Sequence, residues 1–260
     1  MLEYRPPLHV LQFGDAMGGK SSAAASFPKP LLVLLFDLPG KEAPYLRLGT
    51  PEIQEDGHIS VFDAAGDELV RIERYNDLNP EKPVAWANFR KRVTSLHSEM
   101  DYWQTVVLDS FTLAEICARY ESQYRLNVNA KDPRQHYAYS TEELERLVLV
   151  RLGSLPCNVV VNLHIDEVIV QDANNLGGVS TAVKDTINGI RLASPAAPGR
   201  LRKRLPAGFT CLFRTFASGK DGIRRSLWQC QADSTYNAGS NILDLPPVME
   251  ANYDALWEGV

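Results

Sequence analysis

Residues 8–13 read LHVLQF, and the next eight residues, 14–21, read GDAMGGKS. The first stretch is a short apolar run typical of a buried strand, and KSSAAAS at 20–26 predicts the start of a helix, which Pro28 ends. Between them lies the pattern GxxxxGK[ST], in the strand–loop–helix context that it requires. Glycines let successive backbone N–H groups approach phosphate oxygens, so this stretch predicts a loop that binds a nucleoside triphosphate.

The loop also carries side chains suited to nucleotide chemistry. Lys20 can reach the β- and γ-phosphates, and the Ser21 hydroxyl can bind Mg²⁺. The expected cofactors are therefore ATP and Mg²⁺. The residues expected to contact them are Gly14, Asp15, Ala16, Met17, Gly18, Gly19, Lys20, Ser21 and Ser22.

A second motif, VVLDS at 106–110, places Asp109 at the end of an apolar strand. The carboxyl ends of parallel strands meet at one edge of a sheet, where Asp109 could hold Mg²⁺ together with Ser21. An aspartate here could instead cap the following helix. Its pairing with the loop at 14–21 favours the metal role.

The remaining apolar runs predict an α/β fold. LLVLLF at 31–36, QTVVL at 104–108 and CNVVVNL at 157–163 are unbroken, as in strands buried on both faces of a parallel sheet. Helical patterns lie between them, which predicts a mostly parallel central sheet flanked by helices in a single domain over residues 1–260. The expected helices cover 84–100 and 111–124, and a third opens at the capping-box pattern STEE, 140–143; a hairpin insertion is expected at about 57–75 and a C-terminal β-hairpin at 209–216 and 223–230.

The overall composition excludes several classes of protein. Hydrophobic residues make up 45% and charged residues 23% of the 260, with no apolar run long enough to cross a membrane. The start, MLEYRPPLHV, lacks the features of a secretory signal. The four cysteines form no CxxC pair, which disfavours a zinc knuckle and suits reduced thiols. We therefore expect a cytoplasmic protein.

Basic residues are concentrated in one region, at about 186–230. It holds nine Lys and Arg residues and one acid, a local net charge of +8, although the whole chain has a net charge of −5. This asymmetry predicts a polyanionic partner, and single-stranded DNA could follow such loops. A solvated basic face, or arginines paired with an acidic neighbouring subunit, would give the same composition, and Trp228 is a candidate for stacking on a base. The expected DNA contacts are Arg200, Arg202, Lys203, Arg204, Arg224 and Arg225.

Taken together, GDAMGGKS at 14–21, VVLDS at 106–110, VVVNLH at 159–164 and the tail motifs YNAGS at 236–240 and LPP at 245–247 resemble the RecA-like P-loop ATPases encoded by phages. The resemblance is to the compact recombination or single-strand-annealing type. It implies a RecA-like core and DNA-linked ATP hydrolysis in a homo-oligomeric ring or filament. It also implies a phage protein in the host cytoplasm, which could work with a phage single-strand-binding protein.

The resemblance implies roles for further residues. His164 takes the place of a polar sensor of the γ-phosphate. The segment FDLPGKE at 36–42 lies where the family often has a catalytic glutamate; Asp37 is the substitute base and Glu42 the fallback. Lys220 is the first candidate for a basic finger that completes a neighbour's site, ahead of Arg214, Arg224 and Arg225. Asn241 stands where related tails often have an arginine.

Three functions fit these residues. The first is an ATPase that couples ATP binding and hydrolysis to single-stranded DNA binding. The second is a DNA-binding or annealing module in which ATP controls assembly with little turnover, and Pro39 near the expected catalytic glutamate favours it. The third is a nucleotide kinase, against which the absence of a clear lid segment argues.

Overall fold

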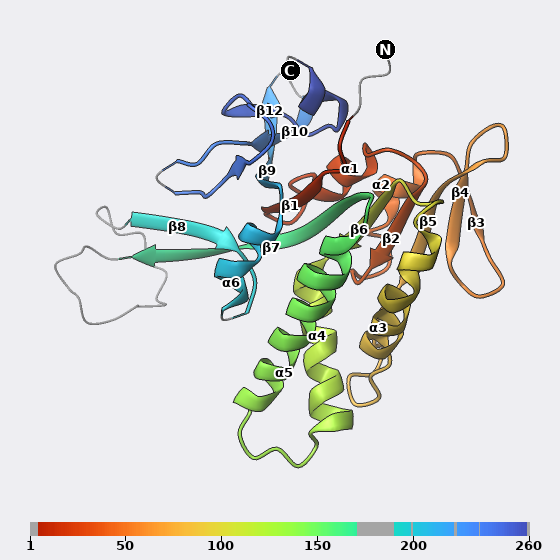
Figure 1. Ribbon diagram of the computed structural model, residues 1–260, viewed down its shortest axis with the longest axis vertical. Coiled ribbons are helices and arrows are strands. Elements are labelled where there is room, and N and C mark those ends of the chain that lie inside the picture. The colour runs from red at the N-terminus through yellow and green to blue at the C-terminus, as the bar shows by residue number, and fades with distance from the viewer. Residues whose placement is uncertain (1–4, 171–189, 199, 221–222, 234, 259–260) are drawn as a thin grey trace.

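The computed structural model describes residues 5–170, 190–198, 200–220, 223–233 and 235–258. A sheet with both parallel and antiparallel pairs forms its centre, with the strand order β12-β10-β9-β1-β7-β6-β2-β5-β4-β3 (Figure 1). The six central strands from β9 to β5 pair in parallel, as predicted for the apolar runs. The strands are β1 (His9–Gly14), β2 (Leu31–Leu35), β3 (Thr50–Ile53), β4 (Ile59–Phe62), β5 (Glu68–Arg74), β6 (Thr105–Asp109), β7 (Asn158–Val170), β8 (Ile190–Pro195), β9 (Cys211–Lys220), β10 (Ile223–Gln229), β11 (Gly239–Ser240) and β12 (Val248–Glu250).

Helices lie on both faces of this sheet. In Figure 1, α3, α4 and α5 project together below the sheet, and β10 and β12 lie at the opposite end. No helix in the described part of the chain is both long and apolar enough to cross a membrane. The α-helices are α1 (Lys20–Ala25), α2 (Ala43–Leu46), α3 (Ala85–Ser95), α4 (Phe111–Glu121), α5 (Arg134–Leu144) and α6 (Leu201–Arg204), and short 3-10 or π segments are η1 (Leu96–Glu99), η2 (Ser122–Leu126), η3 (Glu145–Arg151), η4 (Leu152–Ser154), η5 (Pro206–Gly208) and η6 (Asp254–Trp257).

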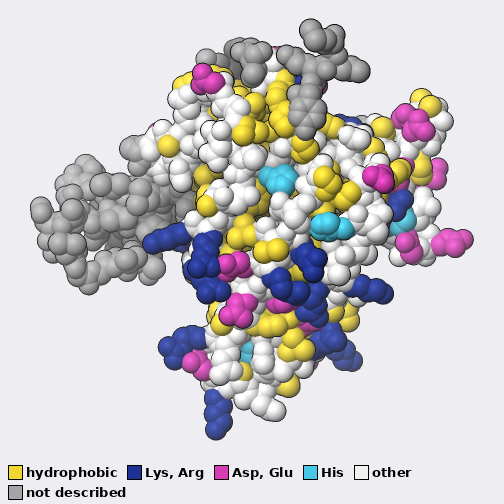
Figure 2. All heavy atoms as spheres, in the orientation of Figure 1, with side chains coloured by type: hydrophobic (Ala, Val, Ile, Leu, Met, Phe, Trp, Pro, Cys, Tyr) yellow, Lys and Arg dark blue, Asp and Glu magenta, His cyan; other side chains and the backbone are white. Residues whose placement is uncertain are grey.

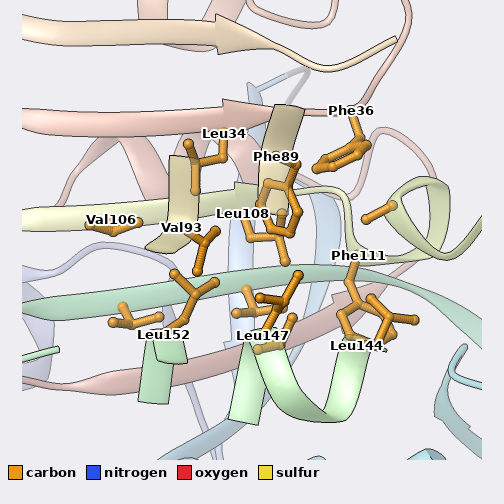
Figure 3. Packing of buried hydrophobic residues seen from close by; sticks show 14 of the residues in the cluster. Leu34, Phe36, Phe89, Val93, Val106, Leu108, Phe111, Leu144, Leu147 and Leu152 are labelled. Carbon is orange, nitrogen blue, oxygen red and sulfur yellow. The ribbon is translucent and has the colours of Figure 1, made fainter. Parts of the chain in front are cut away.

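Alternate residues of the central strands supply two separate cores, because successive side chains of a strand point to opposite faces. Leu34 of β2 and Leu108 of β6 face α3, α4 and η3, where they pack with Phe89 and Leu147 (Figure 3). Their neighbours in sequence face α1 and the C-terminal tail; Val33 belongs to that second cluster. Burial on both faces explains why the strands read as unbroken apolar runs. The predicted α/β fold class is confirmed.

Two predicted elements differ from the structure. The expected hairpin at 57–75 does form, as β4 and β5, but β5 also pairs in parallel with β2, so the hairpin extends the central sheet. The pattern STEE at 140–143 does not open a helix, because α5 already begins at Arg134. Ser140 instead lies inside α5, where its hydroxyl is 2.9 Å from the Glu115 carboxylate of α4 and 3.1 Å from the Tyr137 carbonyl.

Several described segments after residue 165 form strands. β7 continues to Val170 and pairs with β8, so the two strands form an arm beside the sheet (Figure 1). The predicted C-terminal hairpin is confirmed as β9 and β10, and β9 joins the sheet beside β1. Residues 186–189, 199 and 221–222 of the predicted basic region lie outside the described residues.

Candidate functional site

A pocket of about 570 Å³ opens at the edge where the central parallel strands end. β1 leads into the loop at 14–21, β6 ends at Asp109, and β7 carries His164 beside Gly14 of β1. Asp37 follows the end of β2 by two residues. The topology therefore brings together residues that are far apart in the sequence. The lining residues are Ala16, Met17, Gly18, Gly19, Lys20, Ser21, Ser22, Asp37, Gly40, Lys41, Pro44, Arg47, Asp109, Ser110, His164, Arg224 and Ser226.

Lys20 is the first residue of α1, directly after the loop, and it lines the pocket. Its Nζ donates to the carbonyl oxygens of Gly14 at 2.9 Å and Asp15 at 2.8 Å, and the side chain is buried. Burial lowers the pKa of the Lys20 amine, and the nearby Asp109 carboxylate opposes that effect. The loop thus wraps around a buried amine, as a phosphate-binding loop requires. Gly14 and Asp15 act through their backbones and do not themselves line the pocket.

The loop backbone has a left-handed conformation at two places. Gly19 has φ of 101°, and Met17, which is not a glycine, has φ of 63°. A side chain at Gly19 would also overlap the Ser226 hydroxyl of β10, and one at Gly14 would overlap the carbonyl of Thr215 in β9. The glycines of the motif therefore permit close packing against the C-terminal hairpin as well as the loop's own turn.

Asp109 accepts two hydrogen bonds on one carboxylate oxygen. Ser21 Oγ donates to Oδ2 at 2.6 Å, and Tyr45 OH donates to the same oxygen at 2.8 Å. A hydroxyl beside a carboxylate is the kind of oxygen pair that binds Mg²⁺, so Ser21 and Asp109 fit that ion. Tyr45 is fully buried on α2, and burial followed by the Asp109 charge raises its pKa. No sequence pattern marked Tyr45, because it reaches Asp109 only through the fold.

Asp37 and Glu42 differ in what surrounds them. Asp37 lines the pocket, and burial together with the Asp109 charge raises its pKa to about 6. Glu42 accepts hydrogen bonds from the Arg74 guanidinium and from the Gly40 backbone N–H, and it is absent from the residues that line the pocket. Of the two candidates for the base, Asp37 is therefore the one that faces the pocket, and Glu42 pairs with Arg74.

His164 lines the pocket, and its backbone N–H donates to Thr112 Oγ1 at 3.1 Å. Burial and the neighbouring Lys20 lower the pKa of its imidazole, which keeps the ring neutral at pH 7. A neutral imidazole can donate or accept one hydrogen bond at each ring nitrogen. This suits a polar contact to a nucleotide.

Gln12 is a residue that the sequence analysis missed. It is fully buried one strand position before Phe13, and its Nε2 donates to the Lys20 carbonyl at 2.8 Å and to Asn162 Oδ1 at 2.6 Å. Its Oε1 accepts from Trp228 Nε1 at 3.0 Å and from Thr215 Oγ1 at 3.1 Å. This network ties the loop to β7, β9 and β10. A lone glutamine inside the apolar run LHVLQF was the available signal.

The pocket lining carries more positive than negative charge. Lys20, Lys41, Arg47 and Arg224 contribute four cations, whereas Asp37 and Asp109 contribute two carboxyl groups. Lys41 and Arg47 come from the segment around α2, and sequence reasoning did not place them here. An excess of cations in a concave site favours an anionic ligand such as a triphosphate.

Most of the predicted DNA-binding arginines have partners within the chain. Arg200 and Arg204 both pair with Glu145, and Arg202 pairs with Asp166. Lys203 is exposed and has no ion pair among the described residues. On the face drawn in Figure 2, Lys and Arg side chains alternate with Asp and Glu side chains over the lower helices. That face carries no continuous basic patch in the part that the structure describes.

The residues of the β9–β10 hairpin that were predicted to contact DNA or a neighbouring subunit lie in different environments. Trp228 is fully buried, stacked on Phe213 and bonded to Gln12, so its proposed stacking on a base is wrong. Both arginines of β10 are exposed, but Arg224 lines the pocket and donates to the Met17 carbonyl, whereas Arg225 lies outside the lining. Lys220 ends β9, and its side chain lies outside the described residues.

Fold and pocket together define an ATPase-type domain with a P-loop. A family model described as an AAA domain, AAA_24, matches residues 7–239. The chain therefore belongs to this family of AAA domains.

Comparisons with individual proteins add distant similarities. No curated protein matches the chain significantly. Among solved structures, the flagellar accessory protein FlaH from Methanocaldococcus jannaschii matches with 11% identity and a TM-score of 0.39, covering 89% of this chain and 80% of FlaH. A KaiC-like protein from Pyrococcus horikoshii OT3 matches with 9% identity and a TM-score of 0.39, covering 86% of this chain and 78% of that protein.

Proposed function

We propose that this chain is a Mg²⁺-dependent ATPase that couples its nucleotide state to single-stranded DNA binding in phage-type recombination or replication, as a homo-oligomer. One observation carries the ATPase part. Lys20, Ser21, Asp109 and Asp37 come from three separate segments and converge in one cationic pocket. Each group has the chemistry that one part of phosphoryl transfer needs.

The loop at 14–21 and the Lys20 amine would bind the nucleotide. Backbone N–H groups of the loop would offer donors to phosphate oxygens. Lys20 Nζ is held by two neutral carbonyl oxygens, which a phosphate oxygen can replace with a stronger, charge-assisted partner. Binding therefore needs little rearrangement of the lysine.

Ser21 and Asp109 would hold Mg²⁺, and Tyr45 keeps the Asp109 carboxylate oriented. The ion would neutralise charge on the phosphates when it is bound. Tyr45 and Ser21 both donate to Oδ2 of Asp109, which leaves the other carboxylate oxygen available as a ligand.

Asp37 is the proposed general base for the attacking water. Its raised pKa of about 6 makes the carboxylate a better proton acceptor than an ordinary aspartate and leaves it largely ionised at pH 7. Among the described residues that line the pocket, the other carboxylate is that of Asp109, which is assigned to Mg²⁺. His164 would contribute a polar contact near the transferred phosphate.

Support for the DNA part comes from the charge asymmetry of the chain and from the sequence resemblance. The segment 186–230 has a net charge of +8. Lys203 on α6 is exposed, and the arginines around it could exchange their carboxylate partners for phosphates. Such contacts would make DNA binding weaken steeply with salt.

The test is ATP hydrolysis measured with and without single-stranded DNA, at low and at moderate salt. Stimulation by DNA that fades with salt is the expected result. ATP binding with negligible turnover in every condition would instead favour a module in which ATP only controls assembly. Turnover that DNA never changes would remove the DNA part of the proposal and leave the ATPase part standing.

A further inference from the structure

The C-terminal hairpin forms a wall of the nucleotide pocket within the same chain. Three alternate residues of β10 contact the loop or its supporting network. Arg224 donates to the Met17 carbonyl, Ser226 lies against Gly19, and Trp228 bonds to Gln12, which in turn bonds to the Lys20 carbonyl. Because alternate residues of a strand share a face, these three side chains show that one face of β10 packs against the loop and its supporting network.

We propose that Arg224 is a nucleotide-binding residue that acts in its own chain, on the phosphates of the ATP bound at Lys20. The inference rests on the proposed nucleotide site and assigns it a further cation. It differs from both roles that the sequence suggested for Arg224, namely DNA contact and completion of a neighbouring subunit's site.

The position and chemistry of the side chain support this assignment. The guanidinium already reaches the Met17 carbonyl, at the left-handed turn of the loop, and Arg224 is among the residues that line the pocket. A guanidinium binds phosphate through two parallel N–H donors, with more energy than it gains from one neutral carbonyl. Arg224 would therefore exchange the Met17 carbonyl for a phosphate oxygen when ATP binds.

Arg225 provides a matched control on the same strand. It has the same side chain and is exposed, and it pairs in register with Ser218 where Arg224 pairs with Gly219. As the adjacent residue, it projects from the opposite face of β10 and does not line the pocket. Arg225→Ala removes the same charge from the hairpin as Arg224→Ala does, but it leaves the residues that line the pocket unchanged.

The experiment is an equilibrium titration of a fluorescent ATP analogue with Mg²⁺ and without DNA. Arg224→Ala is expected to weaken affinity by about tenfold or more, as the loss of a bond to a charged group does, and Arg224→Lys by less. Arg225→Ala is expected to stay within about twofold of the wild type. An effect of Arg224→Ala no larger than that of Arg225→Ala would overturn the assignment.

Two further measurements keep the result interpretable. If the wild type does not bind the analogue, or if Lys20→Ala binds it equally well, the proposed nucleotide site fails rather than the role of Arg224. Mixing Arg224→Ala with excess Lys20→Ala protein tests which chain supplies the arginine. Action within the chain predicts no recovery of affinity, whereas recovery would show that Arg224 serves a neighbour's site. Both arginine variants should keep the wild-type thermal transition, because the two side chains are exposed.

Discussion

The pocket edge and the basic region differ in how tightly their charged groups are fixed. At the pocket, Lys20 is buried and held by the Gly14 and Asp15 carbonyl oxygens, and Ser21 and Tyr45 both donate hydrogen bonds to the buried Asp109 carboxylate. In and just before α6, by contrast, the arginines are 37–54% exposed and pair with Glu145 or Asp166 at the surface. Surface ion pairs of this kind contribute little free energy and are easily exchanged.

This difference shows what each region can do. Buried groups that are fixed before the ligand arrives can bind and position a triphosphate with little reorganisation. Exposed arginines with replaceable partners can bind a flexible polyanion without selecting one geometry. Variants at the pocket should therefore cause large, specific losses, whereas variants on α6 should cause small changes that depend on salt.

The largest expected effect is that of Asp37→Asn on catalysis. Removal of the base should lower the rate of ATP hydrolysis by roughly 100-fold or more while ATP affinity stays within about twofold. Steady-state hydrolysis and nucleotide titration measure the two quantities separately. Glu42→Gln is the control: it should retain turnover and lose some thermal stability, since it breaks the pair with Arg74. Loss of turnover in Glu42→Gln but not in Asp37→Asn would assign the base to Glu42.

The pH dependence of turnover sharpens the same assignment. A base must be deprotonated to accept a proton, and the pKa of Asp37 is raised to about 6. The rate should therefore rise with pH through about 6 and level off above it, falling by about tenfold per unit at lower pH. Hydrolysis from pH 5 to 8 measures this, with ATP affinity followed in parallel. A rate that is already constant at pH 5 would contradict a base with this pKa.

A smaller effect is expected for Tyr45→Phe, which removes one donor to Asp109 and keeps the ring. The Mg²⁺ concentration needed for half-maximal hydrolysis should rise by about tenfold, as for other groups that orient a metal ligand. Nucleotide binding without Mg²⁺ should stay unchanged, which a purely structural defect would not allow. An unaltered Mg²⁺ requirement would show that Ser21 alone orients Asp109.

The smallest effect belongs to α6. Lys203→Ala should weaken single-stranded DNA binding a few-fold and reduce the slope of log affinity against log salt by about 0.7, the value for one phosphate contact. Arg204→Ala should change the slope less, because its guanidinium already has Glu145 as a partner. Titrations at several salt concentrations measure both variants. Unchanged slopes in both would move DNA contact away from α6.

The sequence predicted the parts of this molecule that depend on neighbouring residues. The loop at 14–21 and the apolar strands follow from local spacing, so their positions could be read directly. Arg47 and Arg224, which line the pocket, and Tyr45, which bonds to Asp109 from beneath it, could not, because each comes from an element that the motif does not include.

The two wrong predictions, for STEE and for Trp228, have a related cause. The pattern STEE resembles a helix start, but packing against α4 allows α5 to begin earlier, at Arg134. Trp228 lies in a basic stretch, yet strand alternation turns its ring into the core beside Phe213. The composition of the basic region could not reveal that Glu145 and Asp166 would reach its arginines from distant elements.

The most direct measurement is calorimetric titration of ATP with Mg²⁺ into the wild type and into Lys20→Ala, with circular dichroism to establish that both are folded. A pocket organised around Lys20 predicts saturable binding to the wild type and a loss of about 100-fold or more in the variant, because a buried charged partner of the phosphates is removed. Equal binding by the two folded proteins would contradict the placement of the nucleotide at the loop 14–21.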